Sequence, residues 1–366
     1  MAKPSWNPKK VTALRNRLLG WYEFSRRDLP WRRSTDPYAI WVSEIMLQQT
    51  RVAVVVERYK SFLARFPTLV SLALAPEQEV LALWSGLGYY RRARMLHKAA
   101  RFVADHHQGN LPARAEELRT LPGIGAYTAA AIASIAHGER VAVVDGNVER
   151  VLCRLAGWEA GGRNGGRAAL RKKIDVLADQ LVDPARPGDF NQALMELGAM
   201  VCLPRNPQCL VCPLASGCVT KGEHKTPPRP RMESREAAYA LSVRTGRQAG
   251  ASNREVLLEQ RPGSAGVMPG MWELPVLREA VFPQEFLRMT LRHAIMQVNY
   301  YVRIRTVFED DAEELLPPGG ARRWVALSEA AGMALTGLAR KVLTRAHLLP
   351  VLPLDTIAPR RQTDVP

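Results

Sequence analysis

Apolar residues recur at three- and four-residue intervals through roughly the first 200 residues of the chain. This spacing places apolar side chains on one face of a helix. It predicts helices over residues 11–24, 51–66, 76–84 and 91–104, separated by short turns that contain Gly and Pro. Residues 1–220 are therefore expected to form an all-α domain.

Beyond about residue 236 the pattern changes to short, β-rich runs at residues 238–243, 255–260, 299–307 and 324–327. Loops with Pro and Gly divide these runs, as is typical of strands. A smaller α+β domain is predicted over 236–354. Residues 221–235 are rich in Pro and charge, which predicts an interdomain linker, and residues 355–366 are expected to be a disordered tail.

The charge of the chain indicates a kind of binding partner. Lys and Arg outnumber Asp and Glu by 51 to 35, a formal net charge of +16. A globular protein this basic generally binds a polyanion, and nucleic acid is the first candidate. No apolar run is long enough to cross a bilayer, and the N-terminal residues have no apolar secretory segment. We expect a cytoplasmic protein with no membrane partner.

Four of the five cysteines are clustered: Cys202, Cys209, Cys212 and Cys218. In a reducing compartment such spacing favours a metal site over disulfides. Thiolates suit zinc or an iron–sulfur cluster. Only one close pair is present where zinc ribbons generally have two, so a structural [4Fe–4S] cluster is favoured over zinc. Cys153 lies in an apolar helical stretch and is expected in the core.

The pentapeptide 121–125 (LPGIG) lies between two predicted helices, 113–120 and 126–136. Gly123 and Gly125 are expected to adopt backbone conformations that other residues resist. Such a turn directs amide N–H groups and a helix N-terminus at one point, which attracts phosphate oxygens. An ordinary turn between two helices is the alternative.

A carboxylate is predicted inside an apolar helix. Asp36 and Pro37 are typical of a helix start, and the helix over 38–47 carries Glu44. Its neighbours one turn away are Ile40, Trp41, Leu47 and Gln48. Desolvation there should raise the pKa of Glu44, so that it carries a proton at neutral pH.

A second carboxylate, Asp145, follows the apolar run 141–144 and precedes a predicted helix over 147–155. The simplest interpretation is a helix N-cap. A catalytic role is compatible with capping, because a cap beside the hairpin would lie close to DNA.

The hairpin, the Asp twenty residues beyond Gly125 and the cysteine spacing together resemble the helix-hairpin-helix DNA glycosylases. Within that superfamily the chain is similar to the adenine glycosylases of the MutY family, closely over about residues 28–218 and more weakly to about 350. The resemblance implies a [4Fe–4S] cluster in the cysteine loop. It also implies a monomer that acts in base-excision repair, removing adenine mispaired with 8-oxoguanine or guanine from double-stranded DNA.

The same resemblance assigns roles to the carboxylates. Glu44, in the run WVSEIMLQQT, would be the general acid that protonates adenine. Asp145 would stabilise the oxocarbenium-like sugar, either electrostatically or through a covalent adduct, and the sequence does not choose between them. Tyr127 and Asn147 would assist the two carboxylates.

Tyr127 also bears on the reaction type. Relatives that resemble endonuclease III read LPGVGRKTA and use the lysine as a Schiff-base nucleophile, whereas this chain has Tyr127 at that position. A phenol cannot form an imine, so hydrolysis without strand cleavage is predicted.

Extrusion of a nucleotide requires residues that fill the gap in the base stack. Gln48, Gln49 and Thr50 end the Glu44 helix, and Tyr89 follows the glycine-containing turn 86–88. The resemblance implies that Gln49 contacts the orphan base and that Tyr89 intercalates beside it, although Tyr89 and Tyr90 would equally suit a core. Residues near the adenine pocket would be Trp31, Arg32 and Gln192.

The C-terminal part resembles a Nudix-like domain, including residues 270–275 (GMWELP), but lacks the REx2E-type carboxylate array. It is therefore expected to recognise DNA without its own catalysis. Relatives recognise 8-oxoguanine through Phe-Ser-His, and this chain has Ile295-Met296-Gln297 there. Either residues such as Gln297 or Asn299 take over this recognition, or discrimination between 8-oxoguanine and guanine is relaxed.

Two other hypotheses remain. The first is a glycosylase of the same fold that removes thymine or uracil opposite guanine, which Glu44 disfavours because protonation suits a purine leaving group. The second is a catalytically silent iron–sulfur DNA-binding regulator, which the presence of both carboxylates disfavours.

Overall fold

The computed structural model describes residues 6–159, 166–224, 231–246, 254–318 and 320–350. The predicted tail and residues 225–230 of the predicted linker lie outside these ranges. The chain divides into two compact units, one of residues 1–74 with 95–228 and the other of residues 75–94 with 229–366.

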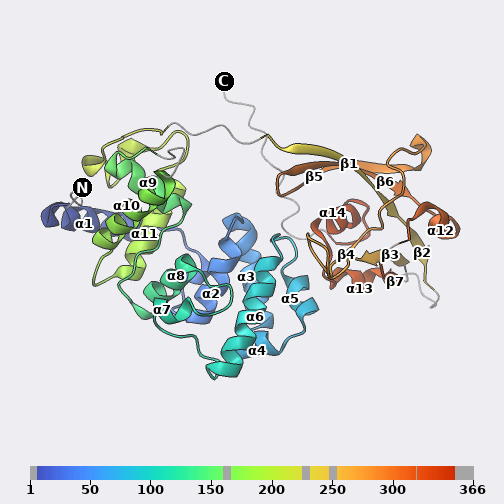
Figure 1. The fold of residues 1–366 in the computed structure, drawn as a ribbon, viewed down its shortest axis with the longest axis horizontal. Helices are drawn as coiled ribbons and strands as arrows, with labels where there is room; N and C mark the ends of the chain where they lie inside the picture. The colour runs from blue at the N-terminus through green and yellow to red at the C-terminus, as the bar shows by residue number, and fades with distance from the viewer. Residues whose placement is uncertain (1–5, 160–165, 225–230, 247–253, 319, 351–366) are drawn as a thin grey trace. The chain divides into compact units, whose positions relative to one another are not determined.

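The first unit is helical, as predicted, and Figure 1 labels its elements. Its helices are α1 (Pro8–Ser25), α2 (Pro37–Leu47), α3 (Val52–Arg65), α4 (Leu69–Leu74), α6 (Arg91–His106, from Met95 onward), α7 (Ala115–Leu118), α8 (Ala126–His137), α9 (Gly146–Ala156), α10 (Gly166–Leu181) and α11 (Pro187–Met200). Short 3-10 turns lie at Pro30–Arg32, Cys209–Val211 and Ala215–Gly217.

Two groups of helices pack within this unit. Helices α1, α9, α10 and α11 surround one apolar core, which extends to the cysteines 202, 212 and 218. Helix α2 packs against α3 and α8, and α7 packs against α8. Helix α11 contacts both α8 and α9, so it joins the group that carries Glu44 to the group that carries Asp145.

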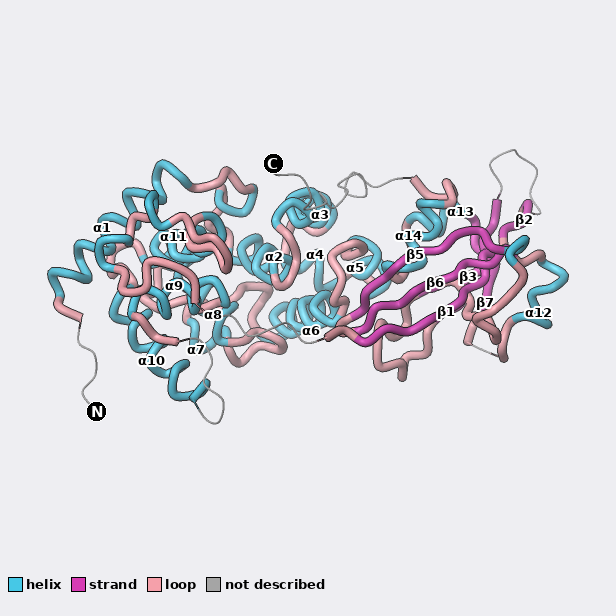
Figure 2. Tube along the Cα trace, turned by 90° about the horizontal axis from the view of Figure 1, so that it is seen from above, coloured by secondary structure: helices cyan, strands magenta, loops and turns pink. Residues whose placement is uncertain are grey.

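The second unit contains two sheets. One has the order β1-β6-β5, with β1 (Glu233–Leu241) parallel to β6 (Val298–Thr306) and β5 (Leu287–Ile295) antiparallel to it. Figure 2 shows these three strands side by side. The other sheet is built around β3 (Arg254–Gln260). Strand β3 pairs with β2 (Val243–Thr245), β4 (Trp272–Glu273) and β7 (Arg322–Ala326). The helices of this second unit are α5 (Glu77–Leu83), α12 (Ala312–Leu315), α13 (Leu327–Ala331) and α14 (Gly337–Arg345).

Three features of this unit differ from the sequence-based expectation. Strand β1 begins at Glu233, inside the predicted linker, and strand β5 was not predicted. Residues 75–94 belong with the C-terminal sheets rather than with the helical unit. Two contacts hold that segment there: Tyr90 Oη donates to the Leu335 carbonyl at 3.2 Å, and Arg340 Nε donates to Ser85 Oγ at 2.6 Å.

No helix within the described ranges has the length and apolar character needed to cross a membrane.

Candidate active site and cysteine pocket

Helix α2 places Glu44 in the interior. Asp36 caps the helix by accepting a hydrogen bond from the Tyr38 amide at 3.0 Å, and Pro37 occupies the first turn, as the sequence predicted. Every residue from Tyr38 to Met46 is buried, and Glu44 itself is only 6% exposed. A helix buried on all sides leaves this carboxyl little access to water.

Glu44 pairs with Tyr127 from α8, whose Oη donates to Glu44 Oε2 at 2.6 Å. Burial raises the pKa of Glu44 to about 7; the hydrogen bond from Tyr127 and the charge of Arg32 oppose the rise, and the charge of Asp145 adds to it. Near neutral pH, Glu44 is therefore divided between a protonated and an ionised form. This is the property expected of a general acid.

Tyr127 remains a neutral phenol in this site. Burial and the neighbouring Glu44 raise its pKa well above the usual value. The Met195 Sδ atom lies 3.5 Å from the same phenol oxygen, on the side of α11. The phenol is thus held between α2 and α11 as a fixed hydrogen-bond donor.

Asp145 is the N-cap of α9, as predicted. Its Oδ1 accepts from the Val148 amide at 2.7 Å, and its Oδ2 accepts from Asn147 Nδ2 at 3.0 Å. Asn147 Oδ1 in turn accepts from Arg150 Nη2 at 3.0 Å, and Arg150 Nε donates to the Cys202 carbonyl at 2.9 Å. These bonds fix the orientation of a carboxylate that is only partly buried.

A buried ion cluster beside these residues was missed by the sequence analysis. Glu196 on α11 is 1% exposed and accepts hydrogen bonds from Arg27 at 2.7 and 2.8 Å and from Arg32 at 2.8 and 3.1 Å. Burial pushes the pKa of Glu196 upward, but these bonds outweigh burial and lower the pKa to about 2. The sequence offered one sign of this cluster, which is the acidic residue Glu196 within the apolar run of α11.

The other residues predicted near the adenine pocket lie on neighbouring elements of the helical unit. Trp31 is 7% exposed and meets the ring of Tyr59 edge-on, with ring centroids 5.5 Å apart. Gln192 lies on α11 and is half-buried. Arg32, next to Trp31 in the chain, is held in the ion cluster by Glu196.

The predicted hairpin is present, with one correction. Gly123 has a φ of +76°, and a Cβ there would lie 2.8 Å from Met95 Cβ, so glycine is required. Gly125 has a φ of −86°, an ordinary extended backbone, so the expectation of a special conformation is wrong for this residue. Gly125 is the N-cap of α8 and has no side chain to cap it, which leaves room beside the helix terminus.

The residues expected to open the duplex lie at exposed turns. Gln49 is exposed and lies just beyond α2, with a φ of +56°. Its neighbours Gln48 and Thr50 are half-buried. Tyr89 is 52% exposed with a φ of +48°, whereas Tyr90 is 4% exposed. The core alternative is therefore correct for Tyr90 and incorrect for Tyr89.

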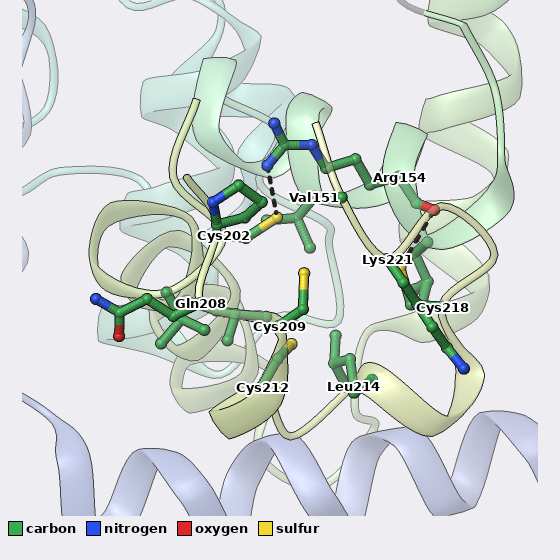
Figure 3. A pocket seen from close by; sticks show the side chains of 15 residues that line it. Val151, Arg154, Cys202, Gln208, Cys209, Cys212, Leu214, Cys218 and Lys221 are labelled. Carbon is green, nitrogen blue, oxygen red and sulfur yellow. Dashed lines mark hydrogen bonds between the residues drawn. The ribbon is translucent and has the colours of Figure 1, made fainter. Parts of the chain in front are cut away.

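All four clustered cysteines line one pocket (Figure 3). Its remaining lining comes largely from the apolar side chains Val151, Leu155, Leu197, Val201 and Leu214. Arg154, 3% exposed, donates to the Leu203 carbonyl at 2.6 Å, to the Pro204 carbonyl at 3.0 Å and to Cys202 Sγ at 3.4 Å. Cys153 is fully buried in the core, as predicted.

The chemistry of this pocket suits a sulfur-ligated group. Four partly buried thiols with apolar neighbours are soft ligands, which fits an iron–sulfur cluster. Within the described ranges, no three Cys, His, Asp or Glu side chains converge as ligands of a single metal ion. A multi-iron cluster binds each thiolate at a different iron, so it does not require the four sulfurs to meet at one point.

The residues that replace Phe-Ser-His lie at the tip of the β5–β6 hairpin. Met296 is 74% exposed and has a φ of +54°, a region that favours glycine. Gln297 beside it is exposed. Asn299 is 7% exposed, and its Oδ1 accepts from Arg292 Nε at 3.3 Å, so Gln297 is the polar side chain at this tip that faces solvent.

Comparison with known proteins supports one family. Residues 42–174 match the profile of the HhH-GPD superfamily of base-excision DNA repair proteins. The chain is 38% identical over 408 residues to an adenine DNA glycosylase of Homo sapiens, covering 91% of this chain and 74% of the human protein. An adenine DNA glycosylase of Mus musculus is 37% identical, with 91% and 77% covered.

Solved structures match somewhat more than half of the chain. A thermostable thymine-DNA glycosylase is 31% identical with a TM-score of 0.52, covering 58% of this chain and 97% of that one. An endonuclease III bound to DNA has a TM-score of 0.50 at 21% identity, covering 59% and 98%, and at that identity it supports the fold alone. Because the matched human protein is similar over most of both chains, this chain belongs to the adenine DNA glycosylase family of the HhH-GPD superfamily.

Proposed function

We propose that this chain is an adenine-specific DNA N-glycosylase of base-excision repair, in which Glu44 acts as general acid. The hydrogen-bonded pair of Glu44 and Tyr127, with a Glu44 pKa of about 7, carries the proposal. The protonated carboxyl donates to a ring nitrogen of adenine, which makes the base a neutral leaving group. The C–N bond then breaks and its electrons remain with the base.

Asp145 stabilises the resulting positive charge on the sugar. Its carboxylate is held at the N-terminus of α9 by the Val148 amide and by Asn147. A negative charge fixed in advance stabilises an oxocarbenium-like state without reorganisation. Water completes the hydrolysis, either directly or after a covalent adduct with Asp145.

Strand cleavage is not part of the proposed reaction. Tyr127 stands where a lysine would form a Schiff base, and its raised pKa keeps it a neutral hydrogen-bond donor. Borohydride treatment during turnover should therefore trap no enzyme on DNA. Trapped complexes would contradict the monofunctional assignment.

The proposed substrate is duplex DNA with adenine opposite 8-oxoguanine or guanine. The net charge of +16, the Gly123 hairpin and the similarity to adenine DNA glycosylases support DNA as the partner. Gln49 and Tyr89, exposed at turns, would meet the orphan base and the stack. We further propose a monomer in the cytoplasm, with a Nudix-like C-terminal domain that contacts the base opposite adenine through the β5–β6 tip.

The cysteine pocket would hold a structural [4Fe–4S] cluster on Cys202, Cys209, Cys212 and Cys218. When bound, such a cluster cross-links the four thiolates and so fixes the loop that contains them. Arg154 orients the loop by binding the Leu203 and Pro204 carbonyls. Equal amounts of iron and acid-labile sulfide, near four of each per chain, are expected; zinc without sulfide would contradict the cluster.

Removal of thymine opposite guanine is the second candidate, because 58% of the chain matches a thymine-DNA glycosylase at 31% identity. The similarity to adenine glycosylases extends over 91% of the chain, including the C-terminal sheets, and so favours adenine.

A single set of duplexes tests the proposal: adenine opposite 8-oxoguanine, guanine or cytosine, and thymine or uracil opposite guanine. Release of free adenine from the first two duplexes is expected. Similar rates opposite 8-oxoguanine and guanine would indicate that the Met296 tip has relaxed the discrimination. Release of thymine or uracil alone would overturn the adenine assignment.

A further inference from the structure

One face of α11 contacts the backbones that carry the catalytic residues. Its members Gly188, Asn191, Met195 and Gly198 are spaced three, four and three residues apart, which places them on a single face of the helix. Each touches a different part of the site on α8, on the segment 141–144 or on α9. We call these four residues the α11 face.

Asn191 contacts the chain that leads to Asp145. It is 2% exposed; its Oδ1 accepts from the Val143 amide at 3.1 Å, and its Nδ2 donates to the Val141 carbonyl and to Ser134 Oγ, both at 2.9 Å. Residues 141–144 form neither helix nor strand. A side-chain amide therefore supplies hydrogen bonds that a neighbouring strand would otherwise make.

The two glycines of the α11 face allow close approach. A Cβ at Gly188 would lie 2.7 Å from the Ser134 carbonyl oxygen on α8, and a Cβ at Gly198 would lie 2.7 Å from Asn147 Cβ on α9. The Gly198 carbonyl also accepts from Arg150 Nη2 at 2.6 Å. Backbone contact at both ends of this face sets the separation of α8 and α9.

The α11 face also contacts the Glu44–Tyr127 pair, through Met195. Met195 Sδ lies 3.5 Å from the Tyr127 Oη atom that donates to Glu44. Val143, Tyr127 and Met195 belong to one small apolar cluster. A single rigid helix therefore contacts both the Glu44–Tyr127 pair and the segment that ends in Asp145.

We propose that Asn191 is a positioning residue for the excision reaction: it fixes segment 141–144 against α8 and α11, and thereby places Asp145 relative to Glu44 and Tyr127. This inference rests on the proposed function for its kinetic consequence, but the placement of the segment does not depend on the substrate. Small displacements of a catalytic group are enough to lower a rate by about 10²-fold.

The test compares Asn191→Ala with Leu194→Ala, a matched control on the same helix. Both native residues are 2% exposed, but Leu194 faces the core shared by α1, α9 and α10. Hydrogen exchange at the Val143 amide should become about tenfold faster in Asn191→Ala, because its acceptor is lost. Leu194→Ala should lower the melting temperature without a selective change at this amide.

Single-turnover excision should fall by about 10²-fold in Asn191→Ala, with the affinity for a duplex containing a non-cleavable adenine nucleotide and the iron content both retained. Leu194→Ala should excise at nearly the wild-type rate. Gly198→Ala, which crowds Asn147 from the same face, should also lose rate while retaining DNA affinity.

Unchanged exchange at Val143, or an Asn191→Ala rate equal to that of Leu194→Ala, would overturn the proposal. Absence of adenine release by the wild-type chain would instead overturn the proposed function, and the exchange measurement would still decide whether Asn191 holds the segment.

Discussion

At the scale of single residues, the site depends on a carboxyl that is costly to ionise. Glu44 has a pKa of about 7 where a free glutamate has 4.5, because it is buried among apolar residues of α2. Tyr127 moderates this effect by donating a hydrogen bond to the carboxylate. The balance between burial and that one bond sets the pH range in which Glu44 can deliver a proton.

Stability should depend on this proton. Because the folded-state pKa lies above the unfolded one, the protonated carboxyl imposes no penalty below pH 4.5, and stability is lost as pH rises from 4.5 through 7. Glu44→Gln removes the ionisable group, so the variant should melt at a higher temperature than the wild type at pH 8, by a difference worth about 3 kcal/mol. The two proteins should differ little at pH 4. A variant that melts lower at pH 8 would contradict the raised pKa.

Tyr127→Phe should shift the pH–rate profile. In the wild type, the hydrogen bond from Tyr127 favours the ionised form of Glu44. Its loss should raise the pKa of Glu44 further, so the activity should persist to higher pH. Tyr38→Phe is the control, because Tyr38 lies on the same helix but donates to the Phe66 carbonyl. We expect the control to lose about 1 kcal/mol of stability without moving the profile. A profile that moves to lower pH in Tyr127→Phe would exclude this role.

At the scale of elements, we assign two functions to one residue at the start of α9. Asp145 caps the helix through the Val148 amide, and under the proposed function it also presents a charge to the sugar. Asn caps helices as well as Asp does, whereas Ala does not. Asp145→Asn should therefore keep the wild-type stability, and Asp145→Ala should lose about 1 kcal/mol.

Both Asp145 variants should lose excision rate, by about 10²-fold or more, because the charge is absent in each. Thermal melting and single-turnover kinetics on the same preparations separate capping from catalysis. Wild-type kinetics in Asp145→Asn would mean that this residue is a cap only.

The elements also show what the sequence could predict. The Asp36-Pro37 start, the apolar neighbours of Glu44 and the run before Asp145 are local patterns, so both carboxylates were placed on the correct elements. Strand β5 was missed although its residues alternate, because His293 breaks its apolar face and Leu291 is its one buried residue. Its partner β6 supplies the pairing that defines it, and pairing is not visible in a single segment.

Contacts between distant residues lay beyond the sequence analysis. Glu196 meets Arg27 across 169 residues of chain, and Asn191 meets Val143 across 48. Burial of each polar group depends on how α11 packs against other helices. For the same reason the grouping of residues 75–94 with the C-terminal sheets could not be read from their helical pattern.

At the scale of the whole molecule, charge is the dominant property. A net charge of +16 predicts that much of the DNA affinity comes from phosphate contacts and is independent of sequence. Binding to a fully matched duplex should weaken with salt, and neutralisation of only three phosphates gives about a 40-fold loss between 50 and 200 mM. Fluorescence anisotropy across that range measures the slope. An affinity that does not change with salt would contradict an electrostatic DNA interface.

The most direct test of the account is the single-turnover release of adenine, opposite 8-oxoguanine, by the wild-type chain and by Glu44→Gln at neutral pH. We predict free adenine from the wild type and a rate at least about 10²-fold lower in the variant, because glutamine cannot supply the proton. Equal rates in the two proteins, or no adenine from the wild type, would contradict the assignment of this chain as a glycosylase that depends on Glu44.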